Sequence, residues 1–140
     1  MNFIFVDFCS LVFEVKAKTD AHILLSQCPE CDGYEIVIGG WNNTKSAIRD
    51  GKQKENKVFI ETPNILSATE FRQFWIHITE GDGDVMISVG KNGEKDPFMA
   101  TTFRKIHSIL YAGFAAGWEN TNEWKVTIPE GEPQLTKELE

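Results

Sequence analysis

Short runs of strictly alternating apolar and polar residues are the feature of this sequence that most limits its fold. In Leu11–Ala17, residues 11, 13, 15 and 17 fall on one face of an extended chain and the residues between them fall on the other. The same period of two recurs in Tyr34–Gly39 and Val85–Gly90. An amphipathic helix would need a period near 3.6. These runs therefore predict β-strands with one buried face.

Turn-forming residues separate the runs. Between them stand Gly, Asp, Asn and Pro, as in Glu80–Asp84, whose Asp-Gly pair favours a hairpin turn. About ten short strands with a turn signal every ~8–12 residues are typical of a sandwich or barrel. We predict an all-β, single-domain, antiparallel β-sandwich of jelly-roll type, with strands at 11–17, 22–26, 34–39, 45–49, 57–62, 70–79, 85–90, 108–117 and 123–128.

The inward positions of these strands define the expected core. They are Phe13, Val15, Ile36, Ile38, Phe74, Ile76, Val85, Ile87, Val89 and Phe114. A chain of 140 residues that is 41% hydrophobic can form such a core as one domain without metal or disulfide. From Pro129 the composition turns to Pro, Glu and Gly. We therefore expect the sandwich over 1–128 and a frayed acidic tail over 129–140, with a short helix imaginable at 136–140.

Charge limits the partners that the chain can bind. Its net charge is −7, whereas nucleic acids and anionic membrane surfaces are bound by basic faces. No apolar run approaches the ~18–20 residues of a membrane helix, and Asp7 interrupts the apolar start early. We expect no nucleic-acid partner and no membrane insertion. The chain as written looks leaderless, which predicts a cytoplasmic protein, one exported by an unusual route, or a mature fragment.

The three cysteines leave their chemistry open. Cys28 and Cys31 form a C-x-x-C pair with Pro29, Asp32 and Gly33 around it, which places the pair in a loop, and Cys9 stands alone. The pair fits two free thiols, a local or intermolecular disulfide, or half of a metal site.

The corner Gly39-Gly40-Trp41-Asn42-Asn43 is the first candidate binding site. Glycines let a ligand approach the backbone, Trp41 offers a flat apolar face to a sugar ring, and Asn42, Asn43 and Arg49 can bond hydroxyls. The structural alternative is a tight turn in which Trp41 plugs the end of the sandwich and Asn43 holds the backbone. The sequence leaves both interpretations open.

Further candidates lie elsewhere in the chain. Trp118, Glu119 and Asn120 repeat the aromatic and polar mixture near the C-terminus, and Arg72 lies in an otherwise aromatic strand, where it can stack, pair or bind a carboxylate. Asp20, His22 and Glu35 raise the possibility of acid–base chemistry, although a hydrogen-bonded strand histidine is the simpler interpretation. His77, between Ile76 and Ile78, reads as a sheet-surface residue. Asp82 and Asp84 are weak candidates for calcium, against a plain acidic hairpin tip.

Several of these motifs together resemble a known family. The chain is similar over about residues 11–126 to the domain named after crustacean farnesoic acid O-methyltransferase. The similarity rests on Asp20-Ala21-His22, Gly39-Gly40-Trp41 with Asn43-Thr44, Phe71-Arg72 with Phe74-Trp75, and the final Gly-Trp and Glu-Trp pairs. The resemblance implies methylation of farnesoic acid with S-adenosylmethionine as cofactor. It equally implies a portable recognition module, because such domains also occur in larger extracellular and immune-related invertebrate proteins.

The residues themselves favour recognition over catalysis. The common methyltransferase scaffold alternates strands with helices and has a Gly-rich turn before a helix, and neither pattern is present. We expect non-catalytic carbohydrate binding, without a cofactor, through Trp41, Asn42, Asn43, Arg49, Arg72, Trp118, Glu119 and Asn120. Weak single-site affinity would then favour a homo-oligomer. The alternatives are the methyltransferase or a binder of farnesoid lipids, and a structural module for oligomerisation.

Overall fold

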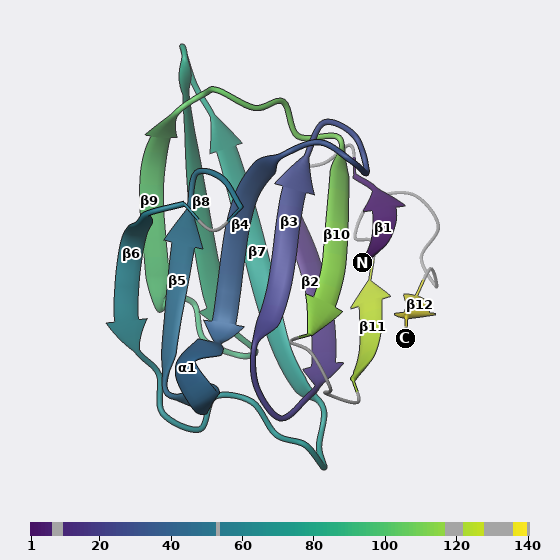
Figure 1. Ribbon diagram of the computed structural model, residues 1–140. Helices are drawn as coiled ribbons and strands as arrows, with labels where there is room; N and C mark the ends of the chain where they lie inside the picture. The colour runs from purple at the N-terminus through teal and green to yellow at the C-terminus, as the bar shows by residue number, and fades with distance from the viewer. Residues whose placement is uncertain (7–9, 53, 117–121, 128–135, 140) are drawn as a thin grey trace.

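Two antiparallel sheets of six strands each pack face to face in the computed structural model (Figure 1). The structure describes residues 1–6, 10–52, 54–116 and 122–127, and the backbone of 136–139. The predicted all-β antiparallel sandwich is confirmed. The jelly-roll subtype and the domain boundary at residue 128 stay predictions.

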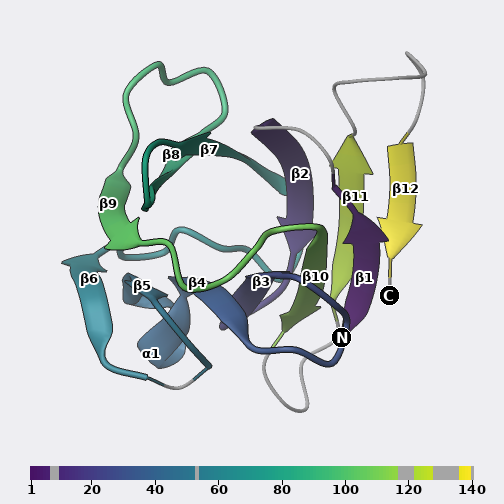
Figure 2. The ribbon, with the colours of Figure 1, turned by 90° about the horizontal axis from the view of Figure 1, so that it is seen from above.

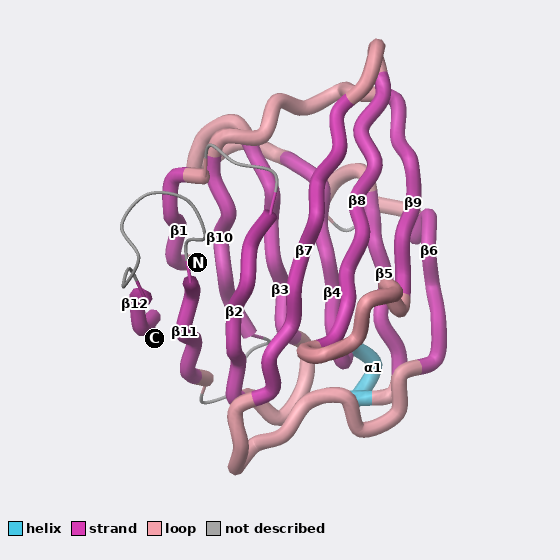
Figure 3. The backbone as a smooth tube through the Cα atoms, turned by 180° about the vertical axis from the view of Figure 1, so that it is seen from behind, coloured by secondary structure: helices cyan, strands magenta, loops and turns pink. Residues whose placement is uncertain are grey.

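The chain fills the two layers mostly in consecutive runs, with β3 to β6 in one sheet and β7 to β9 in the other. We call the layer nearer the viewer in Figure 1 the front sheet; its order is β1 (Asn2–Phe5), β10 (Tyr111–Ala116), β3 (Ala21–Ser26), β4 (Gly33–Gly39), β5 (Lys45–Arg49) and β6 (Asn56–Glu61). The back sheet has the order β12 (Thr136–Leu139), β11 (Glu123–Thr127), β2 (Ser10–Lys16), β7 (Arg72–Glu80), β8 (Asp84–Lys91) and β9 (Met99–Arg104). Figure 2 shows the layers from above and Figure 3 shows the back sheet from behind.

The core fills the space between the inner faces. All ten core residues expected from the alternation are buried, none more than 1% exposed. Phe13 lies at the centre, with its ring centroid 5.8 Å from Phe74, 5.9 Å from Phe114 and 5.8 Å from Trp124. Aromatic side chains bury the largest area per residue, so this cluster is a main contributor to stability.

Three strands were not predicted. β1 and β9 lie outside the predicted set, and Thr136–Leu139 pairs with β11 instead of forming a helix or a frayed end. β9 does carry the alternation, because Met99 and Phe103 are buried. Its threonines and the preceding turn weakened that signal. No helical segment in the described chain is long and apolar enough to cross a bilayer.

The outer face of the front sheet is partly covered. β4 is buried along both faces, and Leu24 of β3, which points outward, is fully buried. A Cβ at Gly113 of β10 would lie 2.5 Å from Phe3, so the N-terminal residues pack on this outer face. Because the outer face of the front sheet is covered only in part, depressions remain beside the segments that cover it.

Replacing Phe13 with alanine tests the role of the aromatic cluster. We expect Phe13→Ala to lower the free energy of unfolding by about 3–5 kcal/mol, because the substitution leaves a cavity among three aromatic rings. Urea unfolding followed by tryptophan fluorescence measures it. Phe5→Ala, at a ring that is 55% exposed, serves as the control and should change the value far less. Equal losses would contradict the proposed core.

Candidate functional site

The Gly-Gly-Trp corner is a single left-handed turn. It forms α1 (Gly40–Asn43), in which Trp41, Asn42 and Asn43 have φ angles of 51°, 62° and 62°. Thr44 N–H donates to the Gly40 carbonyl over 3.0 Å and closes the turn. Gly39 precedes it at φ 65°, and a Cβ there would lie 2.7 Å from the Leu66 side chain. Only glycine fits this entry to the turn.

Backbone strain is concentrated around this corner. Asp20, at φ 58°, lies beside it, since its N–H donates to the Gly39 carbonyl over 2.8 Å. A left-handed non-glycine residue costs roughly 1–2 kcal/mol. Of the five such residues in the described chain, four are Asp20 and the three residues of the turn. Strain of this kind persists only where neighbouring contacts hold it, and it tends to cluster at functional sites.

Asn43 makes several of the hydrogen bonds that stabilise this strained backbone. Its side-chain amide donates to the Leu66 carbonyl over 2.9 Å and its Oδ1 accepts from Leu66 N–H over 3.0 Å. Its own N–H donates to Thr19 Oγ1 over 3.1 Å. The Asn43 side chain thus bonds both the N–H and the carbonyl of Leu66, as a neighbouring β-strand would, and fixes the segment at 64–66. Asn43 clamps the turn to its neighbours, which is the structural alternative that the sequence had left open.

Trp41, Asn42 and Arg49 come together, as the binding interpretation expected. With Asp20, His22 and Val37 they line a depression of about 470 Å³ on the outer face of the front sheet, which we call the outer depression. Trp41 is 41% exposed, with its ring 4.8 Å edge-on from Phe59 and 5.6 Å from the Arg49 guanidinium carbon. Trp41 is therefore a half-exposed wall of the outer depression and not a plug of the sandwich.

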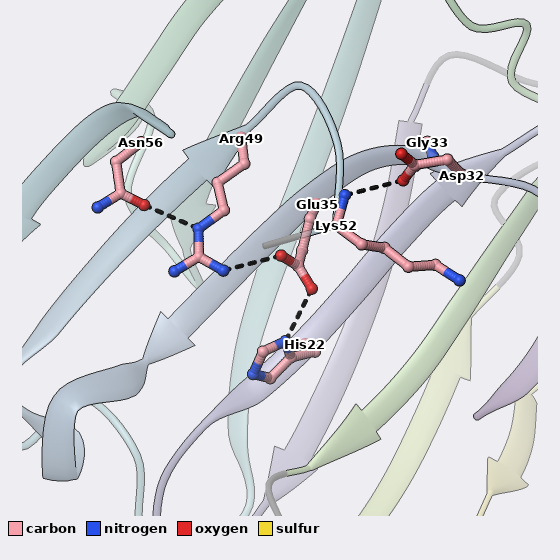
Figure 4. Close-up of polar contacts among 7 residues, drawn as sticks. All are labelled: His22, Asp32, Gly33, Glu35, Arg49, Lys52 and Asn56. Atoms are coloured by element: carbon pink, nitrogen blue, oxygen red, sulfur yellow. Dashed lines mark hydrogen bonds and ion pairs between the residues drawn. The ribbon is translucent and has the colours of Figure 1, made fainter. Parts of the chain in front are cut away.

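A buried charge network underlies the outer depression (Figure 4). Glu35 is only 5% exposed, and its Oε1 accepts from Arg49 Nη1 over 2.9 Å while Oε2 lies 3.1 Å from His22 Nδ1. Arg49 Nε donates to Asn56 Oδ1 over 2.8 Å. Glu35 stands directly opposite Arg49 across β4 and β5. Glu35 was grouped with His22 and Asp20 from the sequence alone, but the link from Glu35 to Arg49 and Asn56 becomes visible only from the strand register.

Several polar groups of the outer depression stay available to a ligand. In the described part of the chain, the Asp20 carboxylate, the Asn42 amide, Arg49 Nη2 and His22 Nε2 make no hydrogen bond. Asp20 can only accept, Arg49 can only donate, and Asn42 does both. Acceptors and donors thus stand side by side around an exposed aromatic ring.

Asp32 fixes the loop that leads from β5 to β6. Its Oδ1 accepts from the N–H groups of Gly33 and Lys52, each over 2.8 Å (Figure 4). Burial acts to raise the pKa of Asp32, but these two hydrogen bonds and the charges of His107 and Lys52 outweigh it, so the pKa lies below its usual value. His107 Nε2 lies 2.9 Å from the Asp50 carbonyl at the start of the same loop.

Arg72 lies in a separate cavity. A space of about 800 Å³ opens between the ends of the sheets, and we call it the inter-sheet mouth. Its apolar lining includes Ile65, Phe74 and Phe98. Arg72 shares the inward-facing alternation of Phe74 and donates to the Asn64 carbonyl over 3.4 Å. The structure thus assigns Arg72 and Arg49 to different cavities.

The remaining candidates are placed as follows. Trp118, Glu119 and Asn120 lie outside the described residues, so the expected polar–aromatic rim with Trp41 stays a prediction. Asp82 and Asp84 are exposed at the hairpin between β7 and β8, and no cluster of three or more metal-ligating side chains occurs in the described chain. His77 is exposed on β7, as predicted. Cys28 and Cys31 form a disulfide in the loop between β3 and β4, which selects one of the three alternatives.

The clamp at Asn43 can be tested by two substitutions. We expect Asn43→Ala to lower the free energy of unfolding by about 2–3 kcal/mol, because it removes two hydrogen bonds and leaves a strained left-handed residue. Asn43→Gly loses the same hydrogen bonds but removes the strain, so its loss should be smaller by about 1 kcal/mol. Chemical denaturation of both variants measures the difference. A change below ~0.5 kcal/mol for Asn43→Ala would exclude the clamp.

Comparison with known proteins identifies the family but no individual relative. Neither the curated proteins nor the solved structures include a significant match to this chain. The family model described as farnesoic acid O-methyltransferase matches residues 3–130, which include every strand of the described sandwich except β12 and the first residue of β1. The resemblance noted in the sequence is thereby confirmed. The chain belongs to the farnesoic acid O-methyltransferase family.

Proposed function

We propose that the protein is a non-catalytic carbohydrate-binding module whose site is the outer depression. The proposal is carried by one observation: the exposed Trp41 ring lies beside Asp20, Asn42 and Arg49 in the lining of the outer depression. In the described chain, the Asp20 carboxylate, the Asn42 amide and Arg49 Nη2 make no hydrogen bond. A sugar presents an apolar C–H face and a rim of hydroxyls. An aromatic wall beside mixed donors and acceptors complements both.

The charges of the outer depression favour a neutral sugar. Two carboxylates, those of Asp20 and Glu35, outnumber the single guanidinium of Arg49. A ligand carboxylate or sulfate would meet Asp20 at close range. Two adjacent hydroxyls fit better, since one can accept from Arg49 Nη2 while the other donates to Asp20.

The shape of the site supports weak binding by each copy. The outer depression is shallow and open, and most of its contacts to a sugar would be single hydrogen bonds that replace bonds to water. Repetition of the site in an oligomer, or in several domains of one chain, would raise the effective affinity. The oligomeric state is part of this proposal.

Removing the aromatic wall tests the proposal. We expect the wild-type protein to bind a neutral glycan on an array, with free sugar competing. Trp41→Asn should weaken binding by about tenfold or more, equivalent to ~1.4 kcal/mol. Asparagine suits the left-handed backbone, so the free energy of unfolding should change by less than ~1 kcal/mol. Isothermal titration and urea unfolding provide the two readouts.

A matched substitution makes the result specific. Met86 is exposed to the same 41% but lies on the back sheet, so Met86→Ala should leave glycan binding unchanged. A blank array at high protein concentration, or equal loss in both variants, would overturn the proposal. A stable oligomer with no ligand would instead favour the structural module.

The inter-sheet mouth supports a second candidate, the binding of a farnesoid acid. An apolar chain would contact Phe74 and Phe98, and Arg72 would pair with the carboxylate. The family description supplies the ligand. Methyl transfer would further require S-adenosylmethionine.

Calorimetry separates this candidate from the first. We expect farnesoic acid to release heat on binding, with affinity lowered about tenfold in Arg72→Gln by loss of the charge-assisted pair. Lys95→Gln, in the neighbouring loop but outside the lining, serves as the control. S-adenosylmethionine is titrated in parallel, and methylated product would establish the enzyme. No heat from either compound would exclude this candidate.

A further inference from the structure

We infer that Glu35 is a positioning residue that sets His22 and Arg49 for ligand hydroxyls in the outer depression. The inference rests on the proposed function and deepens it, because it assigns His22 Nε2 as a hydrogen-bond acceptor. Glu35 itself is 5% exposed and lies beneath the lining residues, so it acts through its two neighbours.

The hydrogen bonds determine which nitrogen of His22 carries the proton. An ionised carboxylate can only accept, so Glu35 Oε2 at 3.1 Å requires a proton on Nδ1. In the neutral ring, Nε2 then carries the lone pair. Figure 4 shows this second nitrogen on the side of the ring away from Glu35. His22 therefore presents an acceptor to the outer depression that it lines.

The same carboxylate orients Arg49. Nη1 donates to Glu35 Oε1 and Nε donates to Asn56 Oδ1, two contacts that fix the plane of the guanidinium. Nη2 makes no hydrogen bond within the described chain and retains both protons for a ligand. The guanidinium carbon lies 5.6 Å from the Trp41 ring centre. Glu35 thus fixes a donor and an acceptor beside the aromatic wall.

The position of this network favours a role in ligand binding over a purely structural role. Burying an ion pair often stabilises a fold less than apolar side chains of similar size would. Two neighbours of Glu35 on the same outer face, Leu24 and Val37, are apolar and buried, so apolar packing is available there. An ion pair between Glu35 and Arg49 that served only stability would not need a histidine. The His22 side chain, however, is 29% exposed and lines the outer depression.

Nitrogen NMR tests the inference without any ligand. The chain has three histidines, and a His22→Gln spectrum assigns the signals of His22. The spectra are recorded at pH 8.5, because basic conditions favour the neutral imidazole, in which only one ring nitrogen carries a proton. Long-range ¹H–¹⁵N spectra should show the proton of His22 on Nδ1 in the wild type. In Glu35→Gln the glutamine oxygen stays with Arg49 and its NH₂ faces Nδ1, so the proton should move to Nε2.

Glycan titration is the second readout. With the glycan found on the array, Glu35→Gln should lower affinity at least tenfold, because His22 then donates where it had accepted. Glu123→Gln is the control, since Glu123 also forms an ion pair, with Lys16 over 2.7 Å, but on the back sheet. It should change neither the affinity nor the tautomer.

The outcomes separate this inference from the proposed function. A wild-type His22 protonated on Nε2, or a Glu35→Gln affinity within twofold of wild type, would overturn the role of Glu35. If Glu35→Gln fails to fold, the wild-type tautomer decides. A wild-type protein that binds no glycan overturns the proposed function, while the tautomer still shows whether Glu35 sets the ring.

Discussion

Burial of the inner faces of the strands decides where the polar residues of the front sheet point. Ile36 and Ile48 pack against the back sheet, so the pleat turns Glu35 and Arg49 to the opposite face. The pairing of β3 with β4 brings His22 to the same face, diagonally across from Glu35. The charge network is therefore a consequence of the core. A shift of β4 by one residue would bury the carboxylate among the aromatic rings and separate the network.

The left-handed turn is the second constraint, and it ties the two cavities together. Trp41 and Asn42 line the outer depression, while the next residue, Asn43, holds the segment at 64–66. That segment contributes Asn64 and Ile65 to the inter-sheet mouth. One strained turn thus orients parts of both cavities. The strained turn is stabilised by hydrogen bonds with Thr19, Asp20 and Leu66, which lie in two other connections of the sandwich.

The sequence predicted the inside of this molecule better than its outside. Alternation identifies inward residues because apolar side chains occupy the buried positions of a strand, and all ten residues predicted for the core are buried. Trp124, which also packs against Phe13, was not among the ten. β9 was missed because threonines dilute its alternation, and β1 because Phe3 and Phe5 face outward and blur the contrast. The link from Glu35 to Arg49 and Asn56 depends on cross-strand register, which no local pattern encodes. The clamp at Asn43 depends equally on a partner 23 residues away.

The outer depression differs from the rest of the front sheet's outer face because a charged side chain is buried beneath it. Elsewhere on that face most buried positions are apolar, as at Leu24, Val37 and Ala47. Glu35 alone among the described charged residues is buried, and its partners His22 and Arg49 both line an open depression. Withdrawing a carboxylate from water is unfavourable unless its partners replace the lost hydration. Arg49 and His22 replace that hydration for Glu35. Arg49 Nη2 and His22 Nε2 make no hydrogen bond in the described chain. The carbohydrate binding that we propose requires such an arrangement, in which a network paired within the protein leaves a donor and an acceptor for ligand hydroxyls.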